Sequence, residues 1–215
     1  MRSKFDSELD SLNNELIILG AMCEAAIKRT IQALENDDKD LAKSIVEDDK
    51  NIDLKERDIE SSCLKLVLQQ QPVARDLRLI SSALKMITDM ERIGDQAADI
   101  AEIIGFTNLS THALSPVLIK MAQATSKMVT DSIDAFVKRD IALARQVMQY
   151  DDIVDELFVN IRDSVINRIS TGQCDGGNMV DIVMMAKYLE RIGDHATNIA
   201  EWVEFAITGN HPEWE

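Results

Sequence analysis

Hydrophobic residues recur along the start of the chain at alternating steps of four and three residues. This spacing places them on one face of an α-helix and is typical of helices that pack in a bundle. The series consists of Phe5, Leu9, Leu12, Leu16, Leu19, Cys23, Ala26 and Thr30. It predicts a first long helix that buries this stripe and ends near Asn36.

Helix-breaking and helix-capping residues divide the rest of the chain into five further helical segments. Pro72 stops one helix and allows the next to begin, and Gly105 is a natural residue for closing that next helix. Ser115 followed by Pro116 has the pattern of an N-cap and a first helical residue. The expected helices span about 38–68, 73–104, 116–139, 140–170 and 178–208.

The two halves of the chain repeat one another. Residues 38–49 align without a gap to residues 140–151, and ERIGDQAADIAE at 91–102 matches ERIGDHATNIAE at 190–201 in 9 of 12 positions. Repeats of this length indicate a duplicated structural unit. The predicted fold is therefore all-α, with six long helices forming two tandem, pseudo-symmetric three-helix bundles. We expect the bundles at 1–107 and 112–209, and a short, loosely held tail at 210–215.

Composition supports helices and limits the partners. Among 215 residues, 46% are hydrophobic and only 4% are aromatic, which suits long helices better than a many-stranded sandwich. The net charge of −15 opposes nucleic acid and anionic lipid surfaces, so membrane contact is expected only through protein partners. The chain lacks an uncharged run of membrane-spanning length, and its early acidic residues exclude a secretory leader. Cys23, Cys63 and Cys174 have no CxxC spacing, so we expect reduced thiols in the cytoplasm.

Acidic residues recur four positions apart in corresponding places of both halves. Four-residue spacing aligns side chains on a helix face, where like charges destabilise the helix by a few tenths of a kcal/mol per pair. Repetition of this cost indicates a compensating cation. The candidate metal ligands are Asp49, Asp53, Glu91, Asp95 and Asp99 in the first half, and Asp151, Asp155, Glu190, Asp194 and Asn198 in the second.

Hairpin geometry places these ladders at one height. If the chain turns near Gln71, Asp49 should be level with residues near Ile93; a turn near Cys174 would place Asp151 level with Thr197. All-oxygen ligands favour hard cations such as Mg²⁺, Mn²⁺, Ca²⁺ or iron over a structural zinc. The expected cofactor is a divalent or multinuclear metal, with iron, manganese, magnesium and zinc left open.

Plainer interpretations stand beside these. An acidic row is often a solvated helix face, and Arg92 and Arg191 could neutralise the acids through ion pairs. We expect exposed or capping roles for His112, His195 and His211 rather than metal ligation. Behind Pro72, the charged residues Arg75, Asp76 and Arg78 form either a helix-capping group or a partner-docking surface.

The doubled ERIGD, together with QPVARDLR at 71–78 and LERIGDHATNIAEWVEF at 189–205, resembles the PhoU family of bacterial phosphate-transport regulators. The resemblance covers nearly the whole chain. It implies two three-helix bundles that hold metal clusters at the candidate positions, with Asn198 departing from the Asp99 of the first copy. It also implies a cytoplasmic repressor of the phosphate-starvation response that acts through the ATPase of a phosphate ABC transporter and a membrane sensor histidine kinase. A homodimer is expected.

Two other functions compete with this non-catalytic adaptor. One is a metal-dependent enzyme, either a di-iron carboxylate oxidase or a metal phosphohydrolase. The first usually needs Glu-x-x-His, but Gly94 and Gly193 occupy the third position after Glu91 and Glu190; the second would use several His ligands, and the chain has three His. The other is a purely structural helical scaffold, whose stability and partner binding would not respond to metal removal.

Overall fold

A computed structural model describes residues 2–70, 72–107, 114–172 and 176–212 of the chain. These residues form six long α-helices and confirm the all-α prediction. The helices are α1 (Arg2–Asn36), α2 (Lys39–Gln70), α3 (Ala74–Phe106), α4 (Ser115–Lys138), α5 (Ile141–Ser170) and α6 (Gly176–Thr208).

The sequence repeat is visible in the backbone where the first and second helices of each half meet. Asp37 and Arg139 occupy matching positions, and both adopt left-handed conformations with φ of 51° and 52°. The next residue caps the following helix in both halves. A side-chain oxygen of Asp38 accepts from the Leu41 amide at 2.9 Å, and that of Asp140 accepts from the Leu143 amide at 3.0 Å. These caps satisfy backbone donors that the first helical turn leaves free.

Two expected boundaries differ from the structure. Gly105 does not close α3, because the helix continues through Phe106 and ends at Thr107 in an extended conformation. At the start of α4, Leu114 is the N-cap and Ser115 is already helical, so Pro116 is the second helical residue. Proline is tolerated throughout the first turn because those amides have no intrahelical acceptor. The expected linker at 108–113 lies outside the described residues.

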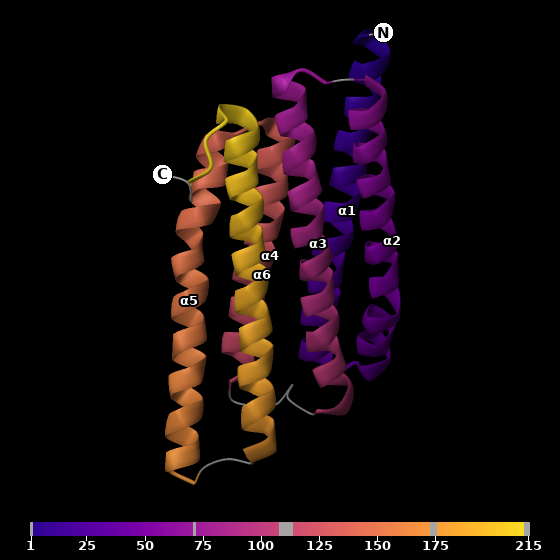
Figure 1. Cartoon of the computed structure of the whole chain (residues 1–215). Coiled ribbons are helices and arrows are strands. Elements are labelled where there is room, and N and C mark those ends of the chain that lie inside the picture. Colours follow the sequence, from indigo (N-terminus) through magenta and orange to yellow (C-terminus); the bar gives the residue numbers. More distant parts are fainter. Residues whose placement is uncertain (1, 71, 108–113, 173–175, 213–215) are drawn as a thin grey trace.

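The helices form two antiparallel three-helix bundles side by side (Figure 1). Helices α1 and α3 of the first bundle pack against α4 and α6 of the second, while α2 and α5 lie on the two outer flanks. The α2–α3 connection is at one end of the molecule and the α5–α6 connection is at the other (Figure 1). The tips of the two outer hairpins therefore point in opposite directions.

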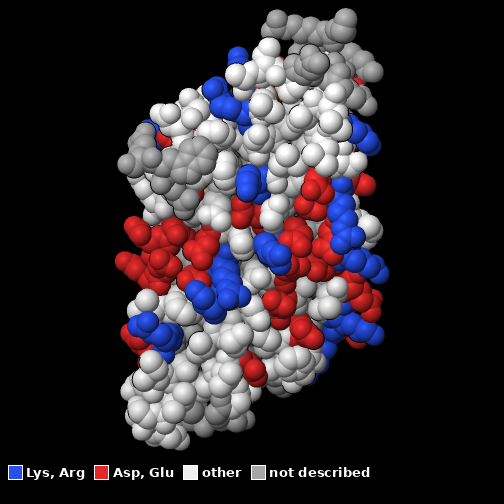
Figure 2. Space-filling model, in the orientation of Figure 1, with Lys and Arg blue, Asp and Glu red and all other residues white. Residues whose placement is uncertain are grey.

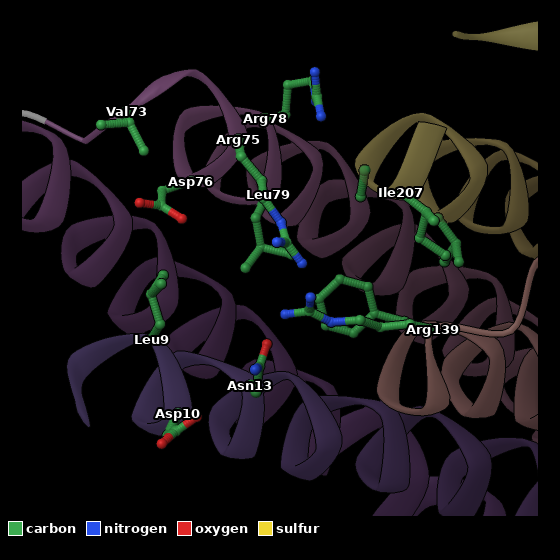
Figure 3. A pocket seen from close by; sticks show the side chains of 13 residues that line it. Leu9, Asp10, Asn13, Val73, Arg75, Asp76, Arg78, Leu79, Arg139 and Ile207 are labelled. Atoms are coloured by element: carbon green, nitrogen blue, oxygen red, sulfur yellow. The ribbon is translucent and has the colours of Figure 1, made fainter. Parts of the chain in front are cut away.

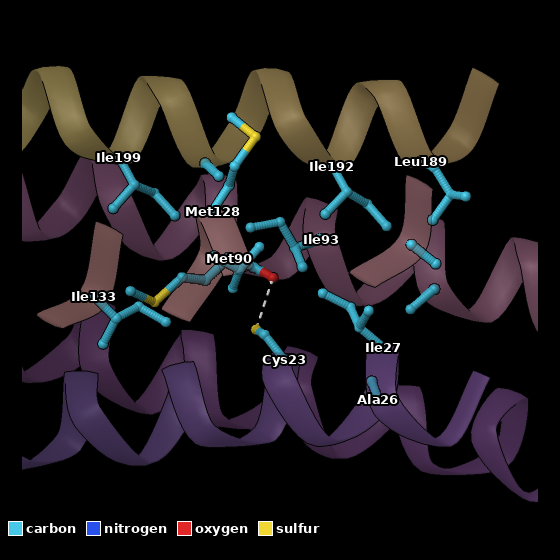
Figure 4. Close-up of a cluster of buried hydrophobic side chains, with 14 of the residues drawn as sticks. Cys23, Ala26, Ile27, Met90, Ile93, Met128, Ile133, Leu189, Ile192 and Ile199 are labelled. Atoms are coloured by element: carbon cyan, nitrogen blue, oxygen red, sulfur yellow. Dashed lines mark hydrogen bonds between the residues drawn. The ribbon is translucent and has the colours of Figure 1, made fainter. Parts of the chain in front are cut away.

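One continuous hydrophobic core joins both bundles. Seven of the eight residues of the predicted stripe in α1 are buried, and Leu9 is partly buried. Figure 4 shows Ile27, Ile93 and Ile192 meeting between the inner helices. Cys23 donates its thiol hydrogen to the carbonyl of Met90 at 3.2 Å, and burial raises the pKa of this thiol to about 12. The thiol is therefore an apolar core group and remains protonated at neutral pH.

The chain end packs more tightly than its sequence suggests. Gly209 ends α6 with a φ of 86°, as expected for a glycine after a helix. His211 then lies against the ring of Trp202, with centroids 4.4 Å apart, and is only 3% exposed. Of the exposed or capping roles expected for His211, the exposed one is wrong, because the contact with Trp202 buries this residue. His112 and Cys174 lie outside the described residues.

No helix in the described part of the chain combines the length and the apolar character that crossing a bilayer requires.

Candidate functional site

Acidic side chains gather on two parts of one face of the molecule (Figure 2). One group lies over α2 and α3 and the other over α5 and α6, with basic side chains between them (Figure 2). Both groups belong to the outer hairpins that carry the acidic ladders. The pseudo-symmetry of the fold therefore produces two separate acidic regions instead of one shared centre.

In the first bundle, three of the candidate ligands converge. Asp49 and Asp53 project from α2 and Asp95 projects from α3, and one carboxylate oxygen from each lies within 4.8 Å of the others. The register expected from the hairpin is also found, because Asp49 lies beside Gly94. Three oxygens at this spacing can contact one hard cation.

Gly94 allows this approach. A Cβ at Gly94 would lie 2.9 Å from Cδ1 of Ile52 and 3.0 Å from Oδ1 of Asp49. A larger residue would force the side chains of Ile52 and Asp49 to move at the level of the carboxylates. The glycine in the first ERIGD motif is therefore a packing requirement of the site, and Ile52 is a contact residue that sequence reasoning missed.

The carboxylates of the first site disfavour ionisation of one another. Burial, followed by the charges of Asp95 and Asp53, raises the pKa of Asp49 to about 6. Burial and nearby acids also raise the pKa of Glu91 and of Asp99. Oδ1 of Asp49 and Oδ1 of Asp53 are buried and accept no hydrogen bond from the described residues. Two buried oxygens without a donor, in a group of three acids, fit a cation better than they fit solvent.

Glu91 and Asp99 lie on either side of this group. Successive steps of four residues rotate about 40° around a helix, so a ladder of three spans about 80° and cannot aim all its members at one point. Arg92 places Nη1 2.8 Å from Asp95 and Nε 3.4 Å from Glu91. The ion pairs considered for Arg92 as the plainer interpretation are thus present. The Arg92 side chain is 55% exposed, however, so these pairs are weak and can rearrange.

The second bundle repeats this arrangement in the same register, with Asp151 beside Gly193 as Asp49 lies beside Gly94. Oδ1 of Asp151 lies 3.2 Å from the position of a Cβ at Gly193. Asp151 is therefore level with Gly193. The prediction from a turn centred on Cys174, which placed Asp151 level with Thr197, was wrong. The midpoint between Asp151 and Gly193 is residue 172, and Gly172 has the left-handed φ of 66° that ends α5. The hairpin thus turns earlier than expected.

The second acidic region is looser than the first. Burial, followed by the charges of Asp155 and Asp194, raises the pKa of Asp151 to about 6, and burial with Glu190 raises that of Asp194. Lys187, three residues before Glu190, pairs with that carboxylate. The grouping of three acidic oxygens within 4.8 Å is found among the described residues only in the first bundle. The two regions are therefore related but unequal.

Two residues of the second motif face the other bundle. Asn198 and His195 on α6 both contact Oδ1 of Asp89 on α3, at 3.1 and 2.8 Å. His195 thus has a bridging role and is not simply exposed. Asp89 was not foreseen as a functional residue, since nothing in the sequence pairs it with residues more than 100 positions away. Lys187 could have been found from its spacing to Glu190.

The expected docking residues lie at the opposite end of α3 from the Phe106 terminus. Arg75, Asp76 and Arg78 occupy its first two turns and line a pocket of about 530 Å³ (Figure 3). The α3 N-cap is Val73, which makes no side-chain capping bond. Asp76 lies in the first turn of α3, where a negative charge is favourable, so the capping interpretation stays open for this residue. The three residues belong to a cavity separate from the acidic regions.

Comparison with known proteins identifies the same two units. The PhoU domain model matches residues 16–104 and 118–203, one segment in each bundle. A phosphate-specific transport system accessory protein PhoU homolog of Clostridium acetobutylicum is 37% identical over 97% of this chain and 96% of its own length. The phosphate-specific transport system accessory protein PhoU of Escherichia coli is 30% identical, over 96% of this chain and 86% of its own.

Solved structures agree with the sequence relatives. The crystal structure of PhoU from Pseudomonas aeruginosa superimposes with a TM-score of 0.89 at 33% identity, covering 96% of this chain and all of that one. The phosphate transport system regulatory protein PhoU from Streptococcus pneumoniae gives 0.90 at 26% identity, covering 96% and 98% of the two chains. The two family matches, the doubled ERIGD motif and the six-helix architecture together show that this chain belongs to the PhoU family.

Proposed function

We propose that this chain is a metal-binding, non-enzymatic adaptor that acts in the cytoplasm and represses the phosphate-starvation response when phosphate is plentiful. It would do so by linking the ATPase of the phosphate transporter to a membrane sensor histidine kinase. Membership of the PhoU family carries this proposal. The relatives are named as accessory proteins of a phosphate-specific transport system, and the S. pneumoniae protein as a regulatory protein of such a system.

Metal binding is proposed for the acidic regions of both bundles. Asp49, Asp53 and Asp95 would hold the ion in the first bundle, flanked by Glu91 and Asp99. In the second bundle the corresponding ligands are Asp151, Asp155, Glu190 and Asp194, with Asn198 turned towards Asp89. A bound cation would neutralise the crowded carboxylates and fix α2 against α3 and α5 against α6. Its role here is to hold the outer hairpins in place.

Exposed apolar side chains at the hairpin tips support docking to protein partners. Leu68 is 82% exposed and Val73 is 64% exposed beside the α2–α3 connection. The α5–α6 tip has a similar set. The exposed residues are Leu64, Leu68, Val73 and Leu77 at one tip, and Ile166, Ile169, Val180 and Met184 at the other. Because the tips are at opposite ends, two different partners could be bound at once.

The composition of the first site favours an adaptor over an oxidase or a phosphohydrolase. All three ligands that converge there are aspartates. Di-iron oxidases of the helical-bundle type add histidines from Glu-x-x-His motifs, and here the third position after Glu91 is Gly94. His195 is occupied by its contact with Asp89. We therefore propose that the metal has a structural and regulatory role.

Co-purification tests the adaptor function. The transporter ATPase and the sensor kinase would each be captured on the full-length chain, once for wild type and once for Glu91→Ala/Glu190→Ala. We expect capture to fall strongly in the double variant. The matched control is Glu35→Ala/Asp58→Ala, which also removes two acids but from exposed positions outside both sites. Equal capture by all three proteins would show that the acidic sites do not control docking.

Activity assays test the enzyme alternative. Oxygen consumption and phosphate-ester hydrolysis would be measured on protein loaded with iron or manganese. We expect no turnover above that of the free metal. Turnover that disappears in Asp95→Ala would replace the adaptor proposal with an enzyme.

A further inference from the structure

A second candidate site lies away from the acidic regions, in the pocket of about 530 Å³ at the α2–α3 end of the molecule (Figure 3). Its walls come from the first part of α1, the first turns of α3 and the C-terminal ends of α4 and α6. Both bundles therefore contribute to it. The volume is within the usual range for small-molecule sites, about 300–1,000 Å³.

Arginines dominate the charge of this pocket. Arg75 and Arg139 direct their guanidinium groups into it and towards each other, and Arg78 lies at its margin (Figure 3). None of the three makes an ion pair with a described carboxylate, although Asp10 and Asp76 also line the pocket. Elsewhere the described arginines that pair with acids include Arg29, Arg92, Arg145 and Arg162. Facing guanidinium groups without a counterion repel each other, and an anion between them would reverse this repulsion.

The backbone at Arg139 is unusual for its residue type. Arg139 ends α4 in the left-handed region, with φ 52° and ψ 44°. Glycine or asparagine is the usual choice at such a position, because a Cβ atom crowds the backbone there and asparagine offsets this cost by local hydrogen bonding. The matching position in the first half is Asp37, a residue type that tolerates this conformation. Arginine at this position is thus explained better by the pocket its side chain reaches than by the turn.

An unmet hydrogen-bond donor belongs to the same cavity. Nε of Arg78 is buried and finds no acceptor among the described residues. The positive end of the α3 dipole, which carries Asp76 in its first turn, lies next to Arg75. The arginine side chains therefore give the pocket donors that prefer a negatively charged acceptor.

Arg75 and Arg78, from the first copy of the repeat, have no arginine counterparts in the second copy. At the offset of 99 that aligns the ERIGD motifs, Arg75 corresponds to Cys174 and Arg78 to Gly177. The bundle architecture therefore forms without these arginines in the second half. Their presence in one copy indicates a function that the fold itself does not require.

The charge and size of the pocket select a ligand class. Guanidinium groups bind phosphate oxygens in a bidentate manner, and two of them match a phosphate dianion better than a single carboxylate charge. The volume exceeds the need of a bare phosphate ion. The rest of the pocket suits an organic group that bears hydroxyl or amino groups. Its apolar walls come from Leu79, Phe136 and Val203, and its hydrogen-bond acceptors from Asp10 and Asn13. We propose that this pocket binds a small phosphate monoester, with its phosphoryl group between Arg75 and Arg139.

Binding can be measured directly, and this proposal does not rest on the adaptor function. Calorimetric titration would use the full-length chain at low salt, with a chelator present so that metal bridging at the carboxylates does not contribute. The probes are adenosine monophosphate, glucose 6-phosphate, adenosine and inorganic phosphate. We expect at least one ester to bind, adenosine not to bind, and inorganic phosphate to bind more weakly by about tenfold or more.

Variants place the binding in the pocket. Arg75→Gln and Arg139→Gly should each weaken ester binding by about tenfold or more, because each removes charged hydrogen bonds. Arg162→Gln is the matched control, since it removes the same charge from an exposed position on α5. Arg139→Gly also relieves the left-handed backbone, so its melting temperature should equal or exceed that of wild type. It therefore separates loss of binding from loss of folding.

Several results would overturn the proposal. Absence of binding by both esters at millimolar concentration would remove the site. Equal affinity for adenosine and its monophosphate would show that the phosphoryl group is not recognised. Inorganic phosphate that binds as tightly as the esters would make the ligand free phosphate. Unchanged binding in Arg75→Gln and Arg139→Gly would place the ligand elsewhere on the chain.

Discussion

Asn198 on α6 donates a hydrogen bond from Nδ2 to Oδ1 of Asp89 on α3, over 3.1 Å and across the boundary between the two bundles. Nδ1 of His195 lies 2.8 Å from the same oxygen. Two residues of the repeated motif at 190–201 thus connect the second bundle to the first bundle. This contact links the two acidic regions through one pair of adjacent helices.

Loss of Asp89 should therefore weaken the association of the bundles. Asp89→Ala leaves the Asn198 amide and the His195 ring without their shared acceptor in a partly buried place. Because hydrogen bonds to a charged group contribute about 1.5–3 kcal/mol, we expect a loss of about 1–3 kcal/mol in the free energy of unfolding. Urea denaturation would measure it. The exposed Asp58→Ala, on α2, should cost much less, and equal losses in both variants would contradict this role for Asp89.

Three glycine substitutions should rank by the space around each site. Gly105→Ala meets no atom within 4 Å and should gain about 0.5–1 kcal/mol, since alanine is the better helix former. Gly193→Ala meets Oδ1 of Asp151 at 3.2 Å and should be close to neutral. Gly94→Ala places Cβ 2.9 Å from Ile52 and should lose about 1 kcal/mol through overpacking. Urea denaturation measures all three; equal effects would show that α2 adapts freely to α3.

Divalent metal should stabilise the chain. A ligand at a free concentration of 100 times its dissociation constant adds about 2.7 kcal/mol to the free energy of unfolding. We expect Mn²⁺ to raise the melting temperature and a chelator to reverse the rise. Asp53→Asn should retain only the part of the rise that comes from the second bundle, and Asp53→Asn/Asp155→Asn should lose it. Calorimetric scans would measure these shifts, and a full shift in the double variant would exclude both acidic regions as metal sites.

Stability without metal should depend on pH through Asp49 and Asp151. Both carboxyl groups have a pKa of about 6 in the folded chain, above their ordinary value of 3.8. Between these values the folded chain holds protons that the unfolded chain has released, so this contribution falls as pH rises. At pH 7, Asp49→Asn/Asp151→Asn should be more stable than wild type.

The control for this pH dependence is its disappearance in acid. By about pH 4 the two carboxyl groups are largely protonated in the folded chain and about half protonated in the unfolded chain. The stability gained by Asp49→Asn/Asp151→Asn over wild type should therefore become small. Thermal unfolding of both proteins in chelator, from neutral to acidic pH, would measure it. A gain that stays constant across this range would show that the charge of these two groups is not the cause.

The sequence was sufficient for the helices and for most of the first acidic site. Helix periodicity, Pro72 and the duplicated Asp38 and Asp140 caps are local features, and local hydrogen bonds and side-chain spacing determine where helices begin and end. The i,i+4 acids and the hairpin register placed Asp49 level with residues near Ile93, and Asp49 indeed lies beside the adjacent Gly94. The prediction of the second site failed in register, because the α5–α6 turn lies earlier in the chain than expected. Asp151 is therefore one helical turn away from its expected neighbour.

By itself the sequence determined the six helices, their duplication and the acidic ladders, because these depend on residues close together in the chain. Only the tertiary structure decided which inner helices pack together. That packing turned Asn198 and His195 towards Asp89 and brought Arg139 to face Arg75. The physical reason is that contacts between helices depend on the combined shapes of side chains far apart in sequence, and neither helical period nor charge spacing encodes that fit.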